Sequence, residues 1–188
     1  FLWSGKDLKP YAAKIKWSSI CSPKSKGGLG IKHLEDWNKA LIIKHLWAIC
    51  SRKDTLWVKW IHTYRIKNKS FWGIKISQDC SWSWRKILAL RNEALNLMRY
   101  KIGNGKNTFL WQDPWHPAGI LQELCPTFLP SQAKVSSIIY NNSWRWPRRL
   151  EAYRDAINFL PNPTAEDQIV CILNSIGDYT VASGWEKI

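Results

Sequence analysis

The stretch of sequence that decides the fold reads His33-Leu-Glu-Asp-Trp-Asn-Lys-Ala-Leu-Ile-Ile-Lys-His-Leu-Trp-Ala-Ile-Cys50. Its apolar side chains recur at the spacings that place them on one face of an α-helix. The apolar positions on or beside this face are Leu34, Trp37, Leu41, Ile43, Trp47 and Ala48. The sequence therefore predicts one long helix with a wide buried face at the centre of the fold.

A second helix is predicted directly downstream. Asp54 can cap a helix that runs to about Ile66, because an aspartate oxygen accepts hydrogen bonds from the first free backbone amides. Its apolar stripe has spacings of three and four and consists of Trp57, Trp60, Ile61 and Tyr64. Its basic residues lie off that stripe: Lys59, Arg65 and Lys67. A serine at position 81 or 83 can begin a third helix, which ends at Met98 and whose apolar face is interrupted only by Arg91.

The second half of the chain is predicted to contain small hairpins and a long loop. Residues 99–111 alternate around Gly103-Asn-Gly105, which can adopt the positive φ angles of a tight turn, and this pattern predicts a β-hairpin. Prolines keep residues 114–134 out of regular structure, apart from a turn near Leu121–Leu124. A helix over Arg148–Leu160 follows. A second hairpin is expected over residues 169–173 and 179–181, with a last helix that Ser183 can cap.

These elements together predict an α+β fold, mainly helical in its first half, with small β-hairpins and a long Pro-rich loop in its second half. The expected organisation is a basic connector over residues 1–32, a helical region over residues 33–98, and a hairpin and loop region over residues 99–188. The first residue is Phe1 instead of a methionine, and the helical pattern of the last residues continues up to Ile188. These features predict a fragment of a longer protein.

Positive charge is concentrated in the first part of the chain. Residues 1–106 contain 22 Lys and Arg against 6 Asp and Glu, whereas residues 107–188 contain 6 against 8. Such an excess points to a polyanion. Nucleic acid fits better than an anionic membrane, because neither a lipid anchor nor a strongly amphipathic basic helix accompanies the charge and no apolar run could span a bilayer. A solubilising surface, or a face that meets an acidic protein, is the alternative.

The sequence contains no recognisable catalytic or metal-binding pattern. The five cysteines are widely separated, which fits neither a disulfide framework nor paired zinc ligands. The four histidines lack ligand spacing, and the acidic residues do not form the aspartate pair that binds two Mg²⁺ ions. Gly27-Gly-Leu-Gly30 matches neither of the common phosphate-binding loops. We therefore predict a noncatalytic chain with no metal site and no cofactor.

Aromatic and basic residues are neighbours at several points, including Lys59-Trp60, Trp82-Ser-Trp-Arg-Lys86 and Trp144-Arg-Trp-Pro-Arg-Arg149. In proteins that bind single strands, aromatic rings stack on bases while cations follow the phosphates. Core packing is the competing interpretation, and it is favoured for the tryptophans on apolar stripes: Trp37, Trp47, Trp60 and Trp84. The more open ones are expected to be Trp82, Trp144 and Trp146. The basic residues expected to contact nucleic acid are Lys14, Lys16, Lys24, Lys26, Lys32, Lys67, Lys69, Arg85, Lys86, Arg99, Lys101 and Lys106.

A series of short blocks follows along the chain in a set order. The first blocks are Trp17-Ser-Ser-Ile-Cys-Ser-Pro-Lys-x-x-Gly-Gly-Leu-Gly-Ile31, Leu34-x-Asp36-Trp-Asn-Lys-Ala-Leu41, Lys44-x-Leu-Trp47 and Leu56-Trp-Val-x-Trp60. The later blocks are Ser81-Trp-Ser-Trp84, Arg99-Tyr-Lys-Ile-Gly-Asn-Gly105, Trp111-x-Asp-Pro-Trp115 and Asp178-Tyr-Thr-Val-Ala-Ser183. Together they resemble the segment of plant non-LTR (LINE-type) retrotransposon polyproteins between the reverse transcriptase domain and the C-terminal zinc-binding domain.

The resemblance implies that the parent protein is an RNA-directed DNA polymerase and that this segment helps it to grip RNA or DNA. The Tyr/Phe-x-Asp-Asp polymerase signature and the zinc ligands are absent from this sequence, so those activities are not carried over. The implied partners are nucleic acid and the flanking polymerase and zinc-binding domains, without a membrane. The implied location is intracellular, and nuclear if the parent is active. Two alternatives are a scaffold that docks polymerase to zinc module without touching nucleic acid, and an inactive retroelement remnant.

Overall fold

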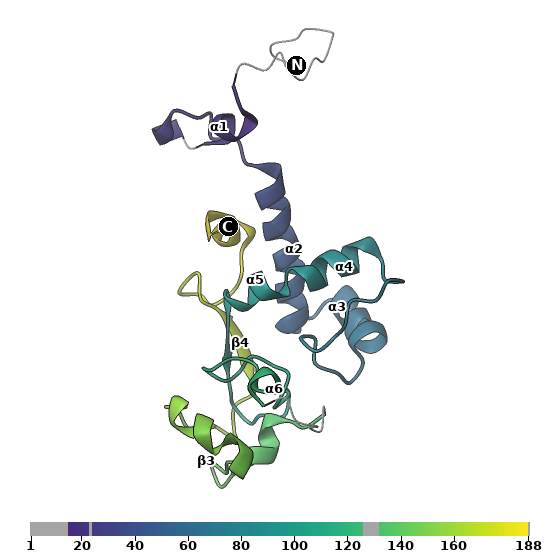
Figure 1. The fold of residues 1–188 in the computed structure, drawn as a ribbon, viewed down its shortest axis with the longest axis vertical. Helices are drawn as coiled ribbons and strands as arrows, with labels where there is room; N and C mark the ends of the chain where they lie inside the picture. The colour runs from purple at the N-terminus through teal and green to yellow at the C-terminus, as the bar shows by residue number, and fades with distance from the viewer. Residues whose placement is uncertain (1–14, 23, 126–131, 188) are drawn as a thin grey trace.

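The structure is a computed structural model that describes residues 15–22, 24–125 and 132–187. It confirms an α+β fold in which helices dominate the first half (Figure 1). The described part of the predicted connector contains α1 (Trp17–Cys21) and the short 3-10 helix η2 (Lys24–Lys26). α1 lies beyond the N-terminal end of the long helix α2 (Figure 1).

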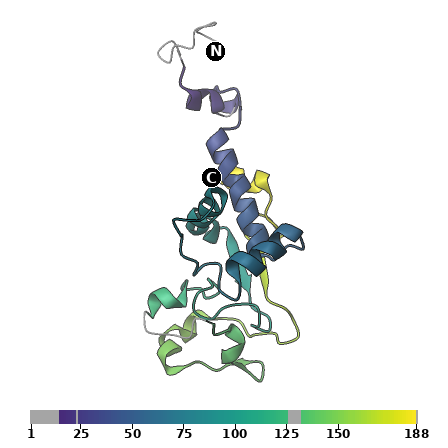
Figure 2. The same ribbon diagram turned by 90° about the vertical axis from the view of Figure 1, so that its right-hand side faces the viewer.

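Helix α2 (Leu34–Cys50) confirms the predicted central helix. Its buried residues are Ala40, Ile43, Leu46, Trp47 and Ile49. Leu34 and Leu41 are exposed, so the buried face is rotated away from the predicted stripe. The reason is that α2 packs against helices α4 (Trp82–Ala89), α5 (Arg91–Leu95) and α7 (Val181–Lys187). The residues turned toward these neighbours are the ones that lose contact with water. Figure 2 shows α7 beside α2.

The second predicted helix forms as α3 (Leu56–Trp60), followed by the π-helical turns of η3 (Ile61–Ile66). The predicted Asp54 cap is wrong, because the Thr55 hydroxyl accepts the hydrogen bond from the Val58 amide at 3.3 Å. Asp54 instead pairs with Lys59. Core packing of Trp60 is also wrong: its side chain is 46% exposed, because Ile61 and Ile66 fill the adjoining core.

The third predicted helix is divided in two. Ser81 caps α4 (Trp82–Ala89) as expected, with its hydroxyl 3.4 Å from the Trp84 amide nitrogen. The chain then leaves the helix at Leu90 and forms α5 (Arg91–Leu95), and Met98 already belongs to a strand. The break occurs where Arg91 turns its guanidinium inward, onto backbone carbonyls of residues 71–74.

Both predicted hairpins are wrong, because the strands pair over long distances. β1 (Met98–Lys101) is antiparallel to β4 (Gln168–Cys171), with Met98 opposite Cys171 and Lys101 opposite Gln168. This pairing satisfies the backbone groups that each local hairpin would have used. Residues 178–180 instead lead into α7 (Val181–Lys187), where the Thr180 hydroxyl rather than Ser183 accepts from the amide at the helix start, at 3.1 Å.

A hairpin does form between β2 (Ile139–Tyr140) and β3 (Ser143–Trp144). Asn141 and Asn142 link the strands with φ angles of 47° and 60°. Positive φ at both central residues is the requirement of a type I′ turn, and asparagine tolerates it better than most residues. The Asn-Asn pair was therefore the local signal for the hairpin in this sequence.

The remaining elements surround this hairpin. α6 (Leu121–Leu124) confirms the turn expected within the Pro-rich loop, and residues 126–131 of that loop lie outside the described residues. η4 (Val135–Ile138) is a 3-10 turn. The helix predicted over residues 148–160 is shorter and of the 3-10 type, η5 (Arg148–Ala156).

Two apolar cores hold the elements together. The first core contains residues of α2, η3, α4 and α5, and it also takes in Cys171 and Tyr179 from the C-terminal part of the chain. The second core is built from Ile102, Leu110, Trp111, Trp115, Leu121, Val135, Ile138 and Leu150, with Trp144 and Trp146 packed against it. The β1–β4 pair leads from one part of the molecule to the other (Figure 1). Within the described ranges, no helix combines the length and apolar character needed to cross a membrane.

Candidate nucleic-acid interface

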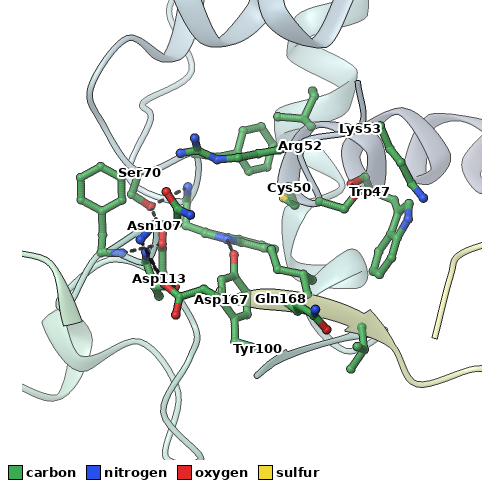
Figure 3. A pocket seen from close by; sticks show the side chains of 18 of the residues that line it. Trp47, Cys50, Arg52, Lys53, Ser70, Tyr100, Asn107, Asp113, Asp167 and Gln168 are labelled. Atoms are coloured by element: carbon green, nitrogen blue, oxygen red, sulfur yellow. Dashed lines mark hydrogen bonds between the residues drawn. The ribbon is translucent and has the colours of Figure 1, made fainter. Parts of the chain in front are cut away.

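A polar cleft of about 550 Å³ lies where the end of α2, η3, residues 69–72, the loop 107–113 and β4 meet (Figure 3). Segments far apart in the sequence supply its walls, so it forms only after the chain has folded. The labelled side chains in Figure 3 include a cationic group, Arg52 and Lys53, and two carboxylates, Asp113 and Asp167.

The Asp167 carboxylate holds the loop that follows β1. One oxygen accepts hydrogen bonds from the Gly103 and Gly105 amides at 2.9 and 2.8 Å. The other accepts from the Asn107 and Thr108 amides at 3.0 and 3.1 Å and from the Thr108 hydroxyl at 2.9 Å. A carboxylate that accepts from several amides at once stabilises one loop conformation strongly. The loop 103–108 is therefore wrapped around a carboxylate rather than turned into a hairpin.

The two glycines of this loop are needed for close approach. A Cβ atom on Gly103 would meet the carbonyl oxygen of Ala165, and one on Gly105 would meet the backbone of residues 135 and 136. Gly105 also has a φ angle of +68°, which side chains disfavour. The glycine-rich block noted in the sequence thus joins three chain segments.

The Asp113 carboxylate is buried on the other wall of the cleft. It accepts hydrogen bonds from the Ser70 hydroxyl and, at 2.8 Å, from the Phe109 amide. Burial raises the pKa of Asp113 to about 6, against the opposing effect of these two donors. Ser70 in turn accepts from the Trp72 amide at 3.1 Å. The Ser70–Asp113 pair therefore ties the loop 107–113 to residues 70–72.

The chemistry available to this cleft is limited. His62 also lines it, but its Nε2 is 3.0 Å from the Ile49 carbonyl oxygen, and partial burial lowers its pKa. Across the described ranges, no three His, Cys, Asp or Glu side chains are grouped so as to hold a metal ion. The Ser70, Asp113 and Asp167 side chains that line the cleft are occupied in holding loops together.

Cations line one side of the cleft. Lys53 pairs with Asp178 at 2.9 Å, and the same carboxylate accepts from the Trp47 indole at 2.7 Å. The side chains of Arg52 and Lys69 are both exposed. In the part of the chain that the structure describes, neither Arg52 nor Lys69 forms an ion pair. Arg52 and Lys53 were not among the predicted contacts, although a basic pair directly after a long helix was visible in the sequence.

The predicted basic residues are exposed wherever the structure describes them. They are Lys16, Lys24, Lys26, Lys32, Lys67, Lys69, Arg85, Lys86, Arg99, Lys101 and Lys106. Lys14 lies outside the described residues. Of these, Lys69 lines the cleft. Arg99 and Lys101 alternate with Tyr100 along β1, so they point to the face of the strand pair opposite the cleft.

The other predicted cations lie on separate elements. Lys16, Lys24 and Lys26 belong to the α1–η2 region beyond α2. Lys32 is placed 3.6 Å from the centre of the Trp37 ring. Arg85 donates to the Gln78 carbonyl at 2.7 Å, and Lys86 lies 5.7 Å from the Trp82 ring centre. The structure therefore spreads these residues along the molecule rather than gathering them at one point.

Two proteins of Arabidopsis thaliana are similar to this chain. The first carries the provisional name ribonuclease H protein At1g65750; identity is 29% over 213 aligned residues, covering 100% of this chain and 33% of that protein. The second is the uncharacterized mitochondrial protein AtMg00310, with 28% identity over 116 residues, covering 61% of this chain and 75% of that protein. The chain thus spans about a third of the length of the first relative. No protein-family model and no solved structure matches it.

Both relatives are plant proteins, in agreement with the plant retroelement resemblance. The blocks that carry that resemblance contact one another in the structure. Asp178 accepts from the indole of Trp47, and the Tyr179 hydroxyl donates to the Ala40 carbonyl at 3.0 Å. These contacts join the last block to two early ones, so the motif residues at positions 40, 47, 178 and 179 stabilise the tertiary fold.

Proposed function

We propose that this chain is a noncatalytic, nucleic-acid-binding part of a plant retroelement reverse transcriptase polyprotein. It contacts RNA or DNA mainly through phosphates, and the flanking polymerase and zinc-binding domains of the same polyprotein are its protein neighbours. The observation that carries the proposal is the exposure of the predicted basic side chains between residues 16 and 106, with the exposed Arg52 and Lys69 lining the polar cleft. The ordered sequence blocks and a relative named for an enzyme that acts on nucleic acid support it.

The arrangement of carboxylates adds to this argument. Four acidic side chains line the cleft: Asp113 and Asp167 accept hydrogen bonds from the protein, Asp178 pairs with Lys53, and Glu166 is exposed. Arg52 and Lys69 are exposed, and within the described residues neither forms an ion pair with a carboxylate. Exposed cations of this kind release condensed counterions when they meet phosphates, and this release favours binding.

Salt dependence tests the proposal. Affinity for a labelled duplex, measured by fluorescence anisotropy, should fall by about 10³-fold between roughly 50 and 200 mM salt if six or so cations contact phosphates. The double variant Arg52→Ala/Lys69→Ala should weaken binding and reduce the slope of log K against log salt by about two. The matched variant Arg148→Ala/Arg149→Ala removes the same charge from exposed residues outside the basic half and should change the slope less.

Binding that is undetectable, or independent of salt, would contradict the proposal. The scaffold alternative draws support from exposed apolar side chains in the C-terminal half, notably Leu160 and Ile176 at 73% and 86% exposure. Tryptophan fluorescence separates the two functions. Quenching by oligonucleotide favours nucleic-acid binding, whereas quenching only by the flanking protein segments favours the scaffold.

A further inference from the structure

Three aromatic side chains of the α3–η3 region face solvent instead of the core. Trp57, Trp60 and Tyr64 are 39%, 46% and 62% exposed. Their spacing of three and four residues places them on one face of the helical segment. Large rings exposed together in this way mark an interaction surface, because a folded protein otherwise buries large apolar side chains away from water. We call these three residues the aromatic platform.

Two rings of the platform are adjacent to each other. The centres of the Trp60 and Tyr64 rings are 5.6 Å apart, with the planes tilted by 34°. Trp57 packs edge-on against His45 of α2 at 5.2 Å, which anchors that end of the platform to the central helix. The rings therefore keep a defined arrangement before any partner binds, which lowers the entropy lost on binding.

The surroundings of the platform are strongly cationic. Residues 55–78 contain five Lys and Arg residues and neither Asp nor Glu. Asp54, just before them, pairs with Lys59. The Arg65 guanidinium lies 5.7 Å from the centre of the Trp60 ring. A protein partner would favour a platform with few charges at its centre, whereas aromatic rings among several cations are complementary to nucleic acid.

The platform and the cleft share one element, η3. His62 and Ile66 of η3 line the cleft, while Tyr64 of the same element belongs to the platform. Lys67 and Lys69 follow η3 directly, and Lys69 reaches the cleft. The chain between the platform and the cleft therefore carries cations that can contact the phosphates of a strand bound on the platform.

We infer that the aromatic platform is a stacking surface for the bases of single-stranded RNA or DNA. This inference rests on the proposed function and adds a preference for single strands. A stacked ring accepts the face of any base, so the expected recognition is tolerant of sequence. Bases within a duplex are already stacked on one another and do not offer that face.

The test compares single strands and a duplex on platform variants. Labelled RNA and DNA of about 12 nucleotides, and a duplex of the same sequence, are titrated by fluorescence anisotropy. The double variant Trp60→Ala/Tyr64→Ala should bind single strands at least tenfold more weakly, with little change for the duplex. Trp60→Phe/Tyr64→Phe should retain most of the affinity, because phenylalanine still stacks. The RNA and DNA titrations show which strand is preferred.

A matched pair of single variants controls for the loss of an exposed ring. Tyr64 and Tyr140 are both 62% exposed, but Tyr140 lies on β2, outside the platform. Tyr64→Ala should weaken single-strand binding, and Tyr140→Ala should not. As an independent readout, ultraviolet crosslinking of a single strand that carries 4-thiouridine should label the peptide covering residues 57–65.

The outcomes separate this inference from the proposed function. The stacking inference is overturned if Trp60→Ala/Tyr64→Ala leaves single-strand affinity unchanged, or weakens single-strand and duplex binding equally. The proposed function still holds in that case if the remaining binding depends on salt. If the platform variant loses self-association while its oligonucleotide affinity is unchanged, the platform is a protein-docking surface. That result also overturns the inference. If the native chain binds neither single strand nor duplex, both proposals fail.

Discussion

At the scale of single residues, two carboxylates near the cleft have different environments. Asp167 receives hydrogen bonds from four backbone amides and one hydroxyl. Asp113 is more deeply buried and receives fewer, so the loss of water outweighs its donors and raises its pKa from 3.8 to about 6. The stability of the protein should therefore depend on the protonation of Asp113.

The expected pH dependence follows from the direction of this shift. Because the pKa of Asp113 is higher in the folded protein, the folded state binds its proton more tightly than the unfolded chain does. Its contribution to the free energy of unfolding should fall as pH rises from about 4 to about 6 and then level off, by roughly 3 kcal/mol at most. Urea unfolding of Asp113→Asn across this range should show the variant gaining stability relative to the native chain.

An exposed carboxylate provides the control for this experiment. Asp155→Asn should leave the pH profile of stability parallel to that of the native chain, because Asp155 is exposed at the end of η5. Parallel profiles for Asp113→Asn as well would show that Asp113 ionises with the same pKa in both states.

At the scale of elements, the break between α4 and α5 is held by Arg91. Its guanidinium donates to the carbonyls of Phe71, Trp72 and Ile74 at 3.2, 2.7 and 2.8 Å. A fourth hydrogen bond goes from Nε to the Leu88 carbonyl at 3.0 Å, near the end of α4. One planar side chain thus satisfies a turn and a helix end that would otherwise lack partners. The residue that interrupts the predicted apolar face is the one that joins two segments.

Substitution of Arg91 by either methionine or lysine should lower the free energy of unfolding. Arg91→Met keeps the apolar stem but leaves partly buried carbonyls without donors, and we expect a loss of about 2 to 4 kcal/mol in the free energy of unfolding. Arg91→Lys keeps the charge but not the planar fork, so it should recover only part of that loss. Chemical denaturation monitored by circular dichroism measures both. Full stability of Arg91→Met would show that water satisfies these carbonyls equally well.

At the scale of the whole molecule, residues near the end of the chain complete the packing of its central helix. Tyr179 is buried in the first core, and its hydroxyl donates to the Ala40 carbonyl in α2. Helix α7 begins two residues after Tyr179 and packs against α2. Gly184 in α7 lies so close to the Tyr179 hydroxyl that a Cβ atom there would overlap the ring. The α2–α7 contact therefore depends on a glycine within a helix.

Gly184→Ala should destabilise the protein even though alanine favours helices. The intrinsic gain of up to about 1 kcal/mol for replacing a helical glycine is opposed by the clash with Tyr179, which overpacks the contact by roughly 1 to 3 kcal/mol. Thermal unfolding should show a lower Tm for the variant. Adding Tyr179→Phe should restore part of the loss, because it removes the oxygen that the new methyl group meets. A higher Tm for Gly184→Ala alone would contradict the contact.

The sequence by itself determined those features that depend on neighbours along the chain. The α+β class, the long central helix, the Ser81 cap and the turn at Leu121–Leu124 were all predictable, because caps and helical periodicity are local. The exposure of the basic residues was predictable for a similar reason, since a charged group without a partner loses solvation energy on burial.

Tertiary structure alone decided the pairing of β1 with β4, the wrapping of the Gly103–Thr108 loop around Asp167, and the burial of Asp113. It also turned Trp60 and Tyr64 outward while Ile61 and Ile66 filled the core. Local patterns show that a strand or an apolar stripe exists, but its partner is selected by the packing energy of contacts between distant segments. That energy depends on which surfaces meet, and the order of residues along one segment does not contain this information.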